Sequence, residues 1–138
     1  MLHRIKILNF AIIEKVEIEF SKGLNIITGE SGSGKTLVVQ ALKVLLGNAK
    51  YKKYLGNYSS VCVIEGFFNC NNEEVKIRRE FSHNDSSIYF NDNIITIKEL
   101  KSFSKFMIDF HGQHEQQYLL NKNVHLRYLD IYSSLEKK

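Results

Sequence analysis

The chain has 138 residues, of which 43% are hydrophobic and 25% charged, and this balance is typical of a soluble globular domain. Its 19 basic and 15 acidic residues leave a net charge of +4, which permits contact with a polyanion without arguing for it. Asn9 and Glu14 interrupt the N-terminal apolar residues, so neither a signal peptide nor a membrane span is expected. We therefore expect a cytoplasmic protein.

Apolar and charged residues alternate twice near the N-terminus, at residues 4–8 and again at residues 16–20. This period of two predicts a pair of half-buried strands. Leu24, Ile26 and Ile27 then predict a third strand, which leads directly into the glycine-rich stretch "GESGSGKT". Small phosphate-loop kinases usually begin with the strand that feeds the loop, whereas here two other strands precede it.

The stretch "GESGSGKT" fits the pattern G-x-x-x-x-G-K-[ST] through Gly29, Gly34, Lys35 and Thr36. Glycines let successive N–H groups point into one concavity, the lysine supplies a cation for the β- and γ-phosphates, and the hydroxyl can ligate Mg²⁺. Apolar residues recur at helical spacing over residues 37–46, and Gly47 follows as the expected helix terminator. A helix N-terminus here adds positive potential to the anion site. The sequence therefore predicts a nucleoside-triphosphate phosphate loop.

Further strands are predicted after this helix, at residues 61–69, 74–81, 86–91 and 93–96. Thr96 and Glu99 fit a capping box that begins a helix with an apolar face ending at Met107. The stretch "MIDF" then predicts a short buried strand, and a last helix is expected from about residue 123. No repeat, proline or linker marks a domain boundary.

Two cysteines and one basic stretch have ordinary interpretations. Cys62 and Cys70 are eight residues apart, without a CxxC motif, and we expect buried, reduced thiols. The stretch "AKYKKY", residues 49–54, mixes lysines with tyrosines in a way that suits a nucleic-acid backbone, but a solvated loop after a helix is the favoured interpretation.

Several acidic and histidine residues are weaker candidates for metal chemistry. Asp109 and Asp130 each follow apolar residues, as the metal carboxylate of a triphosphatase does, but neither is followed by a second acidic residue. His111, His114 and Glu115 lie in "HGQHE", whose spacing differs from that of the zinc motif H-E-x-x-H. We therefore expect no zinc site at this histidine pair.

Two stretches, "ILNFAIIEKVEIEFSKGLNIITGESGSGKT" and "DFHGQHEQQYLL", resemble the RecN family of bacterial DNA-repair proteins, which are relatives of the structural-maintenance-of-chromosomes (SMC) ATPases. The resemblance covers essentially the whole chain. It implies an α/β fold: the first lobe of an ABC-type, P-loop ATPase head, with a mixed sheet around the Walker A loop and an antiparallel β-subdomain. Residues 1–138 would form this N-terminal lobe, and residues from about 123 would lead into a coiled-coil arm.

The resemblance also implies roles for individual residues. Lys35 would contact the β- and γ-phosphates, Thr36 would ligate Mg²⁺, and Gln113, rather than Gln116, would be the Q-loop glutamine that completes the metal coordination. Asp109 would then belong to the strand that enters the Q-loop. The expected ATP-binding residues are Asn9 on the base side, the loop residues Gly29, Glu30, Ser31, Gly32, Ser33, Gly34, Lys35 and Thr36, and Leu37 after them.

This sequence departs from the family pattern at two kinds of place. Asp85 and Ser87 stand where the family has arginines, so a role of those arginines in contacting nucleotide or DNA does not carry over. No L-S-G-G signature loop, aspartate–glutamate pair or switch histidine is present. Cassette ATPases hydrolyse ATP between two heads, and this chain carries only the first half of such a site.

The leading functional hypothesis is therefore an ATP-binding segment of a DNA double-strand-break repair ATPase. ATP binding would drive engagement of two heads in a homodimer of the full-length protein, with DNA bound by that protein at the nucleoid. Hydrolysis would need the C-terminal head lobe, so the segment alone would be nearly inactive. Two alternatives stay open: a complete small phosphotransferase with Asp109 as its metal carboxylate, and an interaction module with a vestigial loop.

Overall fold

The computed structural model describes residues 1–70, 73–104, 108 and 110. The chain divides into two units, Met1–Met107 and Ile108–Lys138. The strands and helices given below all belong to the first unit. The predicted strand at "MIDF" and the predicted last helix fall at or beyond the unit boundary and, apart from Ile108 and Phe110, lie outside the described residues.

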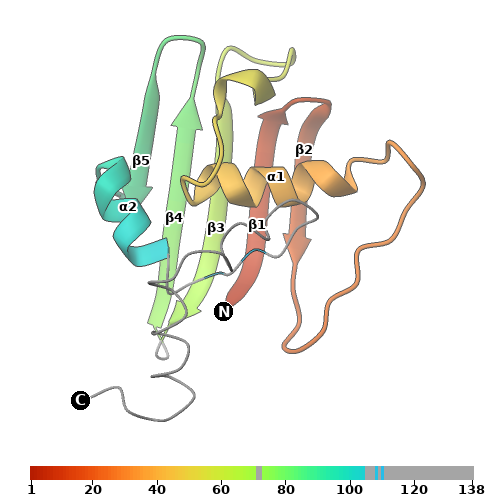
Figure 1. The fold of residues 1–138 in the computed structure, drawn as a ribbon, viewed down its shortest axis with the longest axis horizontal. Coiled ribbons are helices and arrows are strands. Elements are labelled where there is room, and N and C mark those ends of the chain that lie inside the picture. Colours follow the sequence, from red (N-terminus) through yellow and green to blue (C-terminus); the bar gives the residue numbers. More distant parts are fainter. Residues whose placement is uncertain (71–72, 105–107, 109, 111–138) are drawn as a thin grey trace, which may run out of the picture. The chain divides into compact units, whose positions relative to one another are not determined.

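A six-stranded sheet forms the centre of the first unit, with the strand order β2-β1-β3-β4-β5-β6 (Figure 1). Every described pairing is antiparallel. Six of the predicted strands form, with the bounds β1 (Leu2–Phe10), β2 (Ile13–Glu19), β3 (Cys62–Cys70), β4 (Glu73–Phe81), β5 (Ser86–Phe90) and β6 (Asn93–Ile94). The antiparallel part of the expected fold is confirmed. All strands of the described residues belong to this one sheet, so a separate mixed sheet around the phosphate loop is not present among them.

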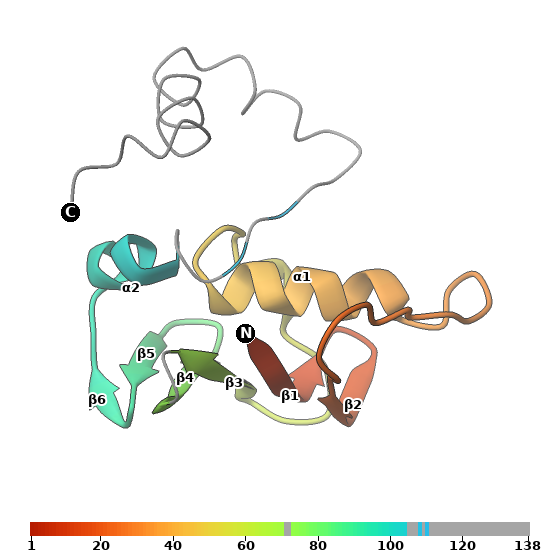
Figure 2. The same cartoon turned by 90° about the horizontal axis from the view of Figure 1, so that it is seen from below.

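One face of this sheet carries the core, because successive side chains in a strand point to opposite faces. The helices α1 (Lys35–Leu45) and α2 (Ile97–Ser104) lie on the same side of the sheet (Figure 2). The fully buried large side chains include residues of the first, third and fourth strands, of α1 and of its C-cap: Ile5, Ile7, Phe10, Ile64, Phe68, Ile77, Phe81, Val44, Leu45 and the C-cap Leu46. Burial of each stabilises the fold by about 1.5–3 kcal/mol.

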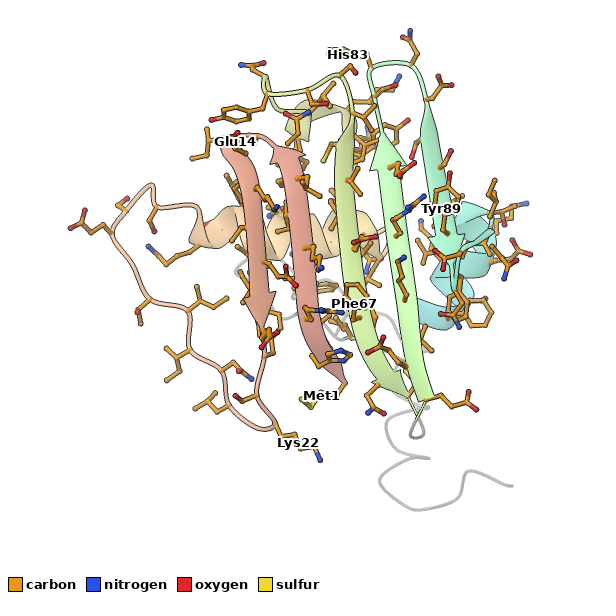
Figure 3. All side chains as sticks on the ribbon, turned by 180° about the vertical axis from the view of Figure 1, so that it is seen from behind. Met1, Glu14, Lys22, Phe67, His83 and Tyr89 are labelled. Carbon is orange, nitrogen blue, oxygen red and sulfur yellow. The ribbon has the colours of Figure 1, made fainter. Side chains whose placement is uncertain are left out.

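The opposite face of the sheet is polar and holds its own charges in pairs (Figure 3). Lys6 lies 3.2 Å from Glu17, and Arg78 lies 3.2 Å from Glu80. Two arginines also stack on aromatic rings: Arg4 is 4.0 Å from the centroid of Phe67, and Arg78 is 4.4 Å from that of Tyr89. Since cations and carboxylates alternate across the strands, this face has no excess of positive charge.

The helix α1 ends as the glycine after it predicts. Gly47 has φ +77° and donates to the main-chain oxygen of Val44, while Asn48 donates to that of Lys43 at 2.7 Å. These two bonds are the Schellman motif, and they satisfy carbonyls that the helix itself leaves free. Arg79, only 5% exposed, adds a bond from Nη1 to the Val44 oxygen at 2.5 Å and lies 4.9 Å from the Tyr51 ring. Burial lowers the pKa of this guanidinium, and the last turn of α1 offers it negative partial charge.

The capping box at α2 is confirmed. Thr96 donates from its main-chain nitrogen to Glu99 Oε2 at 2.7 Å, and Glu99 N donates to Thr96 Oγ1 at 3.3 Å. The helix then buries Leu100 and stacks Phe103 on Phe90, with 5.1 Å between the ring centroids. The ring contact attaches α2 to β5, which lies next to the edge strand β6.

The strand predicted at residues 24–27 is wrong for this structure, because no strand is present between Glu19 and the phosphate loop. Leu24 is 86% exposed and Ile26 74% exposed. Instead, Asn25 folds the segment locally, with bonds to Ser21 and to the main-chain oxygen of Gly23. A strand needs a neighbour for its N–H and C=O groups, and the part of the chain that the structure describes offers none here.

Candidate nucleotide site

The phosphate loop has the backbone that its glycines permit. Gly32 has φ +83° and Gly34 φ +92°, values that side-chain-bearing residues rarely adopt. Gly34 is also the N-cap of α1, and its oxygen accepts bonds from the nitrogens of Leu37 and Val38. The helix N-terminus therefore opens directly onto the loop, where its free N–H groups favour an anion.

At Gly29, the first glycine of the loop, a Cβ atom would lie 2.7 Å from Ser33 Oγ, which is closer than non-bonded carbon and oxygen atoms normally approach. The glycine at position 29 therefore has a steric cause in this chain, because Ser33 fills the space that a side chain there would need. Ser33 N also donates to the Glu30 oxygen at 3.2 Å, which closes the loop on itself.

Lys35 is folded back into the loop. Its Nζ donates to the main-chain oxygens of Gly29 and Glu30 and lies 3.2 Å from Ser33 Oγ. The ammonium thus occupies the concavity that the loop surrounds, held by carbonyl groups rather than by a carboxylate. Three donors on a flexible four-carbon stem allow this group to exchange carbonyl partners for phosphate oxygens without moving the backbone.

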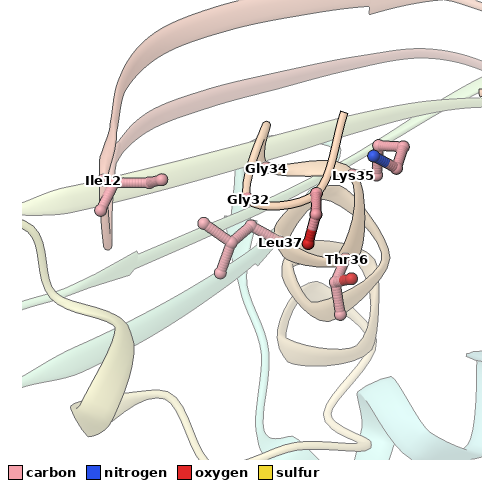
Figure 4. Close-up of a pocket in the computed structure, with 7 residues that line it drawn as sticks. Ile12, Gly32, Gly34, Lys35, Thr36 and Leu37 are labelled. Atoms are coloured by element: carbon pink, nitrogen blue, oxygen red, sulfur yellow. The ribbon is translucent and has the colours of Figure 1, made fainter. Parts of the chain in front are cut away.

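A cavity of about 360 Å³ lies between the loop and the turn of the β1–β2 hairpin (Figure 4). Its lining consists of the loop and helix residues Ser31, Gly32, Gly34, Lys35, Thr36 and Leu37, together with Ile12 of the hairpin. Figure 4 shows Ile12 reaching from the hairpin toward Leu37, across from the glycines of the loop. The cavity therefore has a polar side at the loop and an apolar side formed by two aliphatic residues.

The remaining predicted site residues fall into two groups. Glu30, Ser31, Ser33 and Thr36 are exposed at the surface of the loop, and the metal role of Thr36 stays a prediction. The candidates of the second glutamine- and histidine-containing stretch lie outside the described residues: Asp109, His111, Gln113, His114, Glu115, Gln116 and Asp130. Their predicted roles stay predictions.

Asn9, predicted on the base side of the site, is only 3% exposed. Its Nδ2 donates to the main-chain oxygens of Ser59 at 2.7 Å and Val61 at 3.0 Å, and its Oδ1 accepts from Tyr58 N at 3.0 Å. All these partners belong to the segment that follows α1, and a direct contact with a nucleotide stays a prediction.

Ile12 was not among the residues predicted from the sequence. Its signal is an aliphatic side chain in a turn: "FAII" joins two strands through Ala11 and Ile12, where polar residues are usual. Ile12 is 65% exposed in the structure, and an exposed apolar residue beside a polar loop is a candidate for ligand contact.

The stretch "AKYKKY" contains a short 3₁₀ turn, η1 (Lys52–Tyr54), in the loop that follows α1.

Both cysteines are free thiols: Cys62 is buried, and burial raises its pKa to about 12, while Cys70 is half-buried. Among the residues that the structure describes, no group of three or more His, Cys, Asp or Glu side chains is arranged to hold a metal ion. No described helix has the length and apolarity needed to cross a membrane.

Comparison with protein families gives a match to a model described as an AAA domain, over residues 4–133. Similar proteins include DNA repair protein RecN of Bacillus subtilis, 29% identical over 154 residues, with 99% of this chain and 27% of the relative covered. The RecN protein of Aquifex aeolicus is 32% identical over 138 residues, with 100% and 25% covered. The chain thus spans about a quarter of the length of these relatives, and the predicted resemblance is confirmed.

Solved structures agree in fold. A chain from work on "ATP-driven dimerization and DNA stimulated activation of SMC ATPases" superimposes with a TM-score of 0.71 at 21% identity, covering 93% of this chain and 96% of that chain. The SMC head domain from Thermotoga maritima gives a TM-score of 0.66 at 24% identity, covering 74% and 41%. The predicted fold class, an α/β P-loop ATPase head of the ABC type, is confirmed.

Proposed function

Because the chain belongs to the AAA domain family, we propose that it is the ATP-binding N-terminal segment of the head of a RecN-like DNA-repair ATPase. The observation that carries the proposal is the loop Gly29–Thr36, which caps α1 and holds the Lys35 ammonium in its concavity. A loop with this geometry suits a triphosphate better than any other common ligand, since it offers both N–H groups and a cation.

The residues present fit ATP and its metal. Phosphate oxygens would replace the Gly29 and Glu30 carbonyls as acceptors for Lys35, and N–H groups at the start of α1 would bind them as well. Mg²⁺ in such sites keeps several waters and is bound largely through the phosphate oxygens, and the hydroxyl that follows the loop lysine is one of its protein ligands, the role proposed for Thr36. Gln113 is proposed to complete this coordination. The metal would neutralise charge on the β- and γ-phosphates.

The apolar side of the cavity is proposed to take the nucleoside. Ile12 and Leu37 face each other across the space beside the loop, and an aliphatic pair of this kind can pack against a base without reading its hydrogen-bonding edge. The hairpin therefore supplies contact area, while the loop supplies the charge.

The exposed segment before the loop supports a second lobe as partner. Leu24, Ile26 and Ile27 are 86%, 74% and 44% exposed and lie directly before the phosphate loop. Since the chain spans about a quarter of its relatives' length, the remaining part of the protein is proposed to pair with this segment and to complete the head. Two such heads would engage when ATP binds and separate after hydrolysis, in a protein that acts on DNA at the nucleoid.

Equilibrium binding of Mg-ATP, followed by calorimetry, tests the proposal. Lys35→Ala is expected to weaken binding about 10- to 100-fold, because charge-assisted hydrogen bonds contribute about 1.5–3 kcal/mol. Lys98→Ala, a lysine exposed on α2, is the matched control and should bind as the unsubstituted chain does. Equal affinities for all three chains would refute the proposal.

Steady-state turnover separates the proposed head segment from a complete phosphotransferase. We expect negligible ATP hydrolysis by the 138-residue chain over a wide range of protein concentrations. Turnover that is independent of concentration and lost in Lys35→Ala would mean that one chain contains the whole catalytic site, which contradicts the need for a second lobe.

A further inference from the structure

We infer that Asn9 is a positioning residue for the nucleotide site: it holds the Ala11–Ile12 turn beside the phosphate loop, and acts on the nucleoside only through Ile12. This inference rests on the proposed function, because it presupposes that a nucleotide binds at the loop. It assigns to Asn9 an indirect role in place of the direct contact expected from the sequence.

The hydrogen bonds of Asn9 leave little for a ligand. Both donors of its amide are used by the oxygens of Ser59 and Val61, and its oxygen already accepts from Tyr58 N. The orientation of the amide follows from these partners, since two carbonyls must face the nitrogen and an N–H must face the oxygen. With 3% of its surface exposed, Asn9 is part of the framework beneath the site.

The backbone around Asn9 needs this support. Asn9 has φ +53° and Ala11 φ +52°, and for alanine the left-handed region costs about 1–2 kcal/mol. A turn that contains two such residues, separated by a single residue, persists only when other contacts hold it. The main chain supplies two such contacts: Gly56 N donates to the main-chain oxygen of Asn9 at 3.0 Å, and Ala11 N donates to the main-chain oxygen of Tyr54 at 2.7 Å.

The segment that receives these bonds, residues 54–61, is also tied to α1 and to Ile12. Tyr54 donates from its hydroxyl to Gln40 Oε1 at 3.0 Å and stacks on Phe10, with 4.7 Å between the ring centroids. The Tyr58 hydroxyl donates to the Ile12 oxygen at 3.3 Å. Since Gln40 lies on the helix that the phosphate loop caps, this segment sets the spacing between the loop and Ile12.

The consequence is a separation of roles. Loss of Asn9 should release the turn, withdraw Ile12 from the cavity and weaken binding of the nucleoside. The affinity of the loop for phosphates should not change. A residue that merely stabilises the fold would affect both parts of the ligand alike. Inorganic tripolyphosphate, which has the phosphates and lacks the nucleoside, distinguishes the two cases.

The experiment compares dissociation constants for Mg-ATP and Mg-tripolyphosphate. Asn9→Gly keeps a residue that tolerates φ +53° and removes the amide. We expect it to weaken ATP about tenfold and to leave tripolyphosphate within about twofold. Asn91→Gly is the matched control: Asn91 has φ +46°, accepts from Lys76 N at 2.8 Å, and lies in the β5–β6 turn at the other end of the sheet order. It should change neither constant.

Tyr58→Phe keeps the test decisive if Asn9→Gly does not fold. It removes only the bond to the Ile12 oxygen from a side chain that is 56% exposed, so folding should be unaffected, and ATP should weaken about threefold with tripolyphosphate unchanged. Equal weakening of both ligands, or no change in ATP, would overturn the inference. If Lys35→Ala changes the dissociation constant of neither ligand, the proposed function fails as well. If Lys35→Ala weakens binding of both ligands, but substitution of Asn9 or Tyr58 leaves the ratio of the two dissociation constants unchanged, only the inference fails.

Discussion

Gly56 is where a single methyl group should disturb the hairpin most. It is buried, and a Cβ atom on it would lie 2.4 Å from Asn9 Oδ1, 2.9 Å from the Ala11 oxygen and 3.0 Å from the Asn9 carbonyl carbon. Two of these atoms are main-chain atoms, and the third belongs to an amide with three hydrogen bonds, so none can move aside freely.

The cost of Gly56→Ala follows from these contacts. Overpacking of this kind costs about 1–3 kcal/mol, and each bond that the displaced amide loses costs about 0.5–1.5 kcal/mol. We therefore expect the free energy of unfolding to fall by about 2–4 kcal/mol, measured by urea denaturation with circular dichroism, since the chain has no tryptophan.

A second glycine provides the control for Gly56→Ala. Gly23 has φ +89° and nothing within 4 Å of the position of a Cβ atom, so Gly23→Ala should cost only the backbone strain, about 1–2 kcal/mol. If Gly56→Ala destabilises the chain no more than Gly23→Ala does, residues 54–61 do not pack closely around Asn9 and the reasoning is refuted.

Four further outcomes follow from the described residues. Thr96→Ala should lower the free energy of unfolding by about 0.5–2 kcal/mol through loss of the N-cap. Hydrogen bonds from Thr96 lower the pKa of Glu99, so the carboxylate stabilises the fold above its unfolded-state pKa, and this effect should be lost as the pH falls through the lowered folded-state pKa. Glu99→Gln should therefore match the unsubstituted chain in urea denaturation only in acid. Because burial keeps the Cys62 thiol protonated, iodoacetamide near pH 8 should label Cys70 and spare Cys62 until urea is added, as read by mass spectrometry; equal labelling in the folded chain would contradict this. Leu24→Ser should change the free energy of unfolding by less than about 0.5 kcal/mol, since Leu24 is 86% exposed, and a larger loss would mean that Leu24 packs within the chain.

Local patterns predicted most of this fold. Alternation of apolar and polar residues gave the strands, because a half-buried sheet imposes a period of two. The capping box at Thr96 and the terminating Gly47 were visible for the same reason: both depend on residues within a few positions of each other. The phosphate loop belongs to this class, since its glycines and lysine act over eight residues.

Two features depended on residues far apart in the chain and were therefore missed or incomplete. The segment around Ile26 has the composition of a strand, yet strand formation requires a pairing partner that composition does not reveal. The role of Asn9 depends on bonds to residues about 50 positions later, and a motif match assigns a residue to a site without saying where its amide points.

The order of the strands has a consequence for how the chain acquires its structure. β3, β4, β5 and β6 are each neighbours in sequence as well as in the sheet, whereas β1 reaches β3 only across the phosphate loop and α1. Contacts of short sequence separation form faster, because less loop-closure entropy opposes them. We therefore expect the β3–β6 meander to form early and the β1–β2 hairpin to join it late, so the phosphate loop would acquire its shape in the last step of folding. Substitutions beneath the hairpin should then mainly speed unfolding, while those within the meander should slow folding.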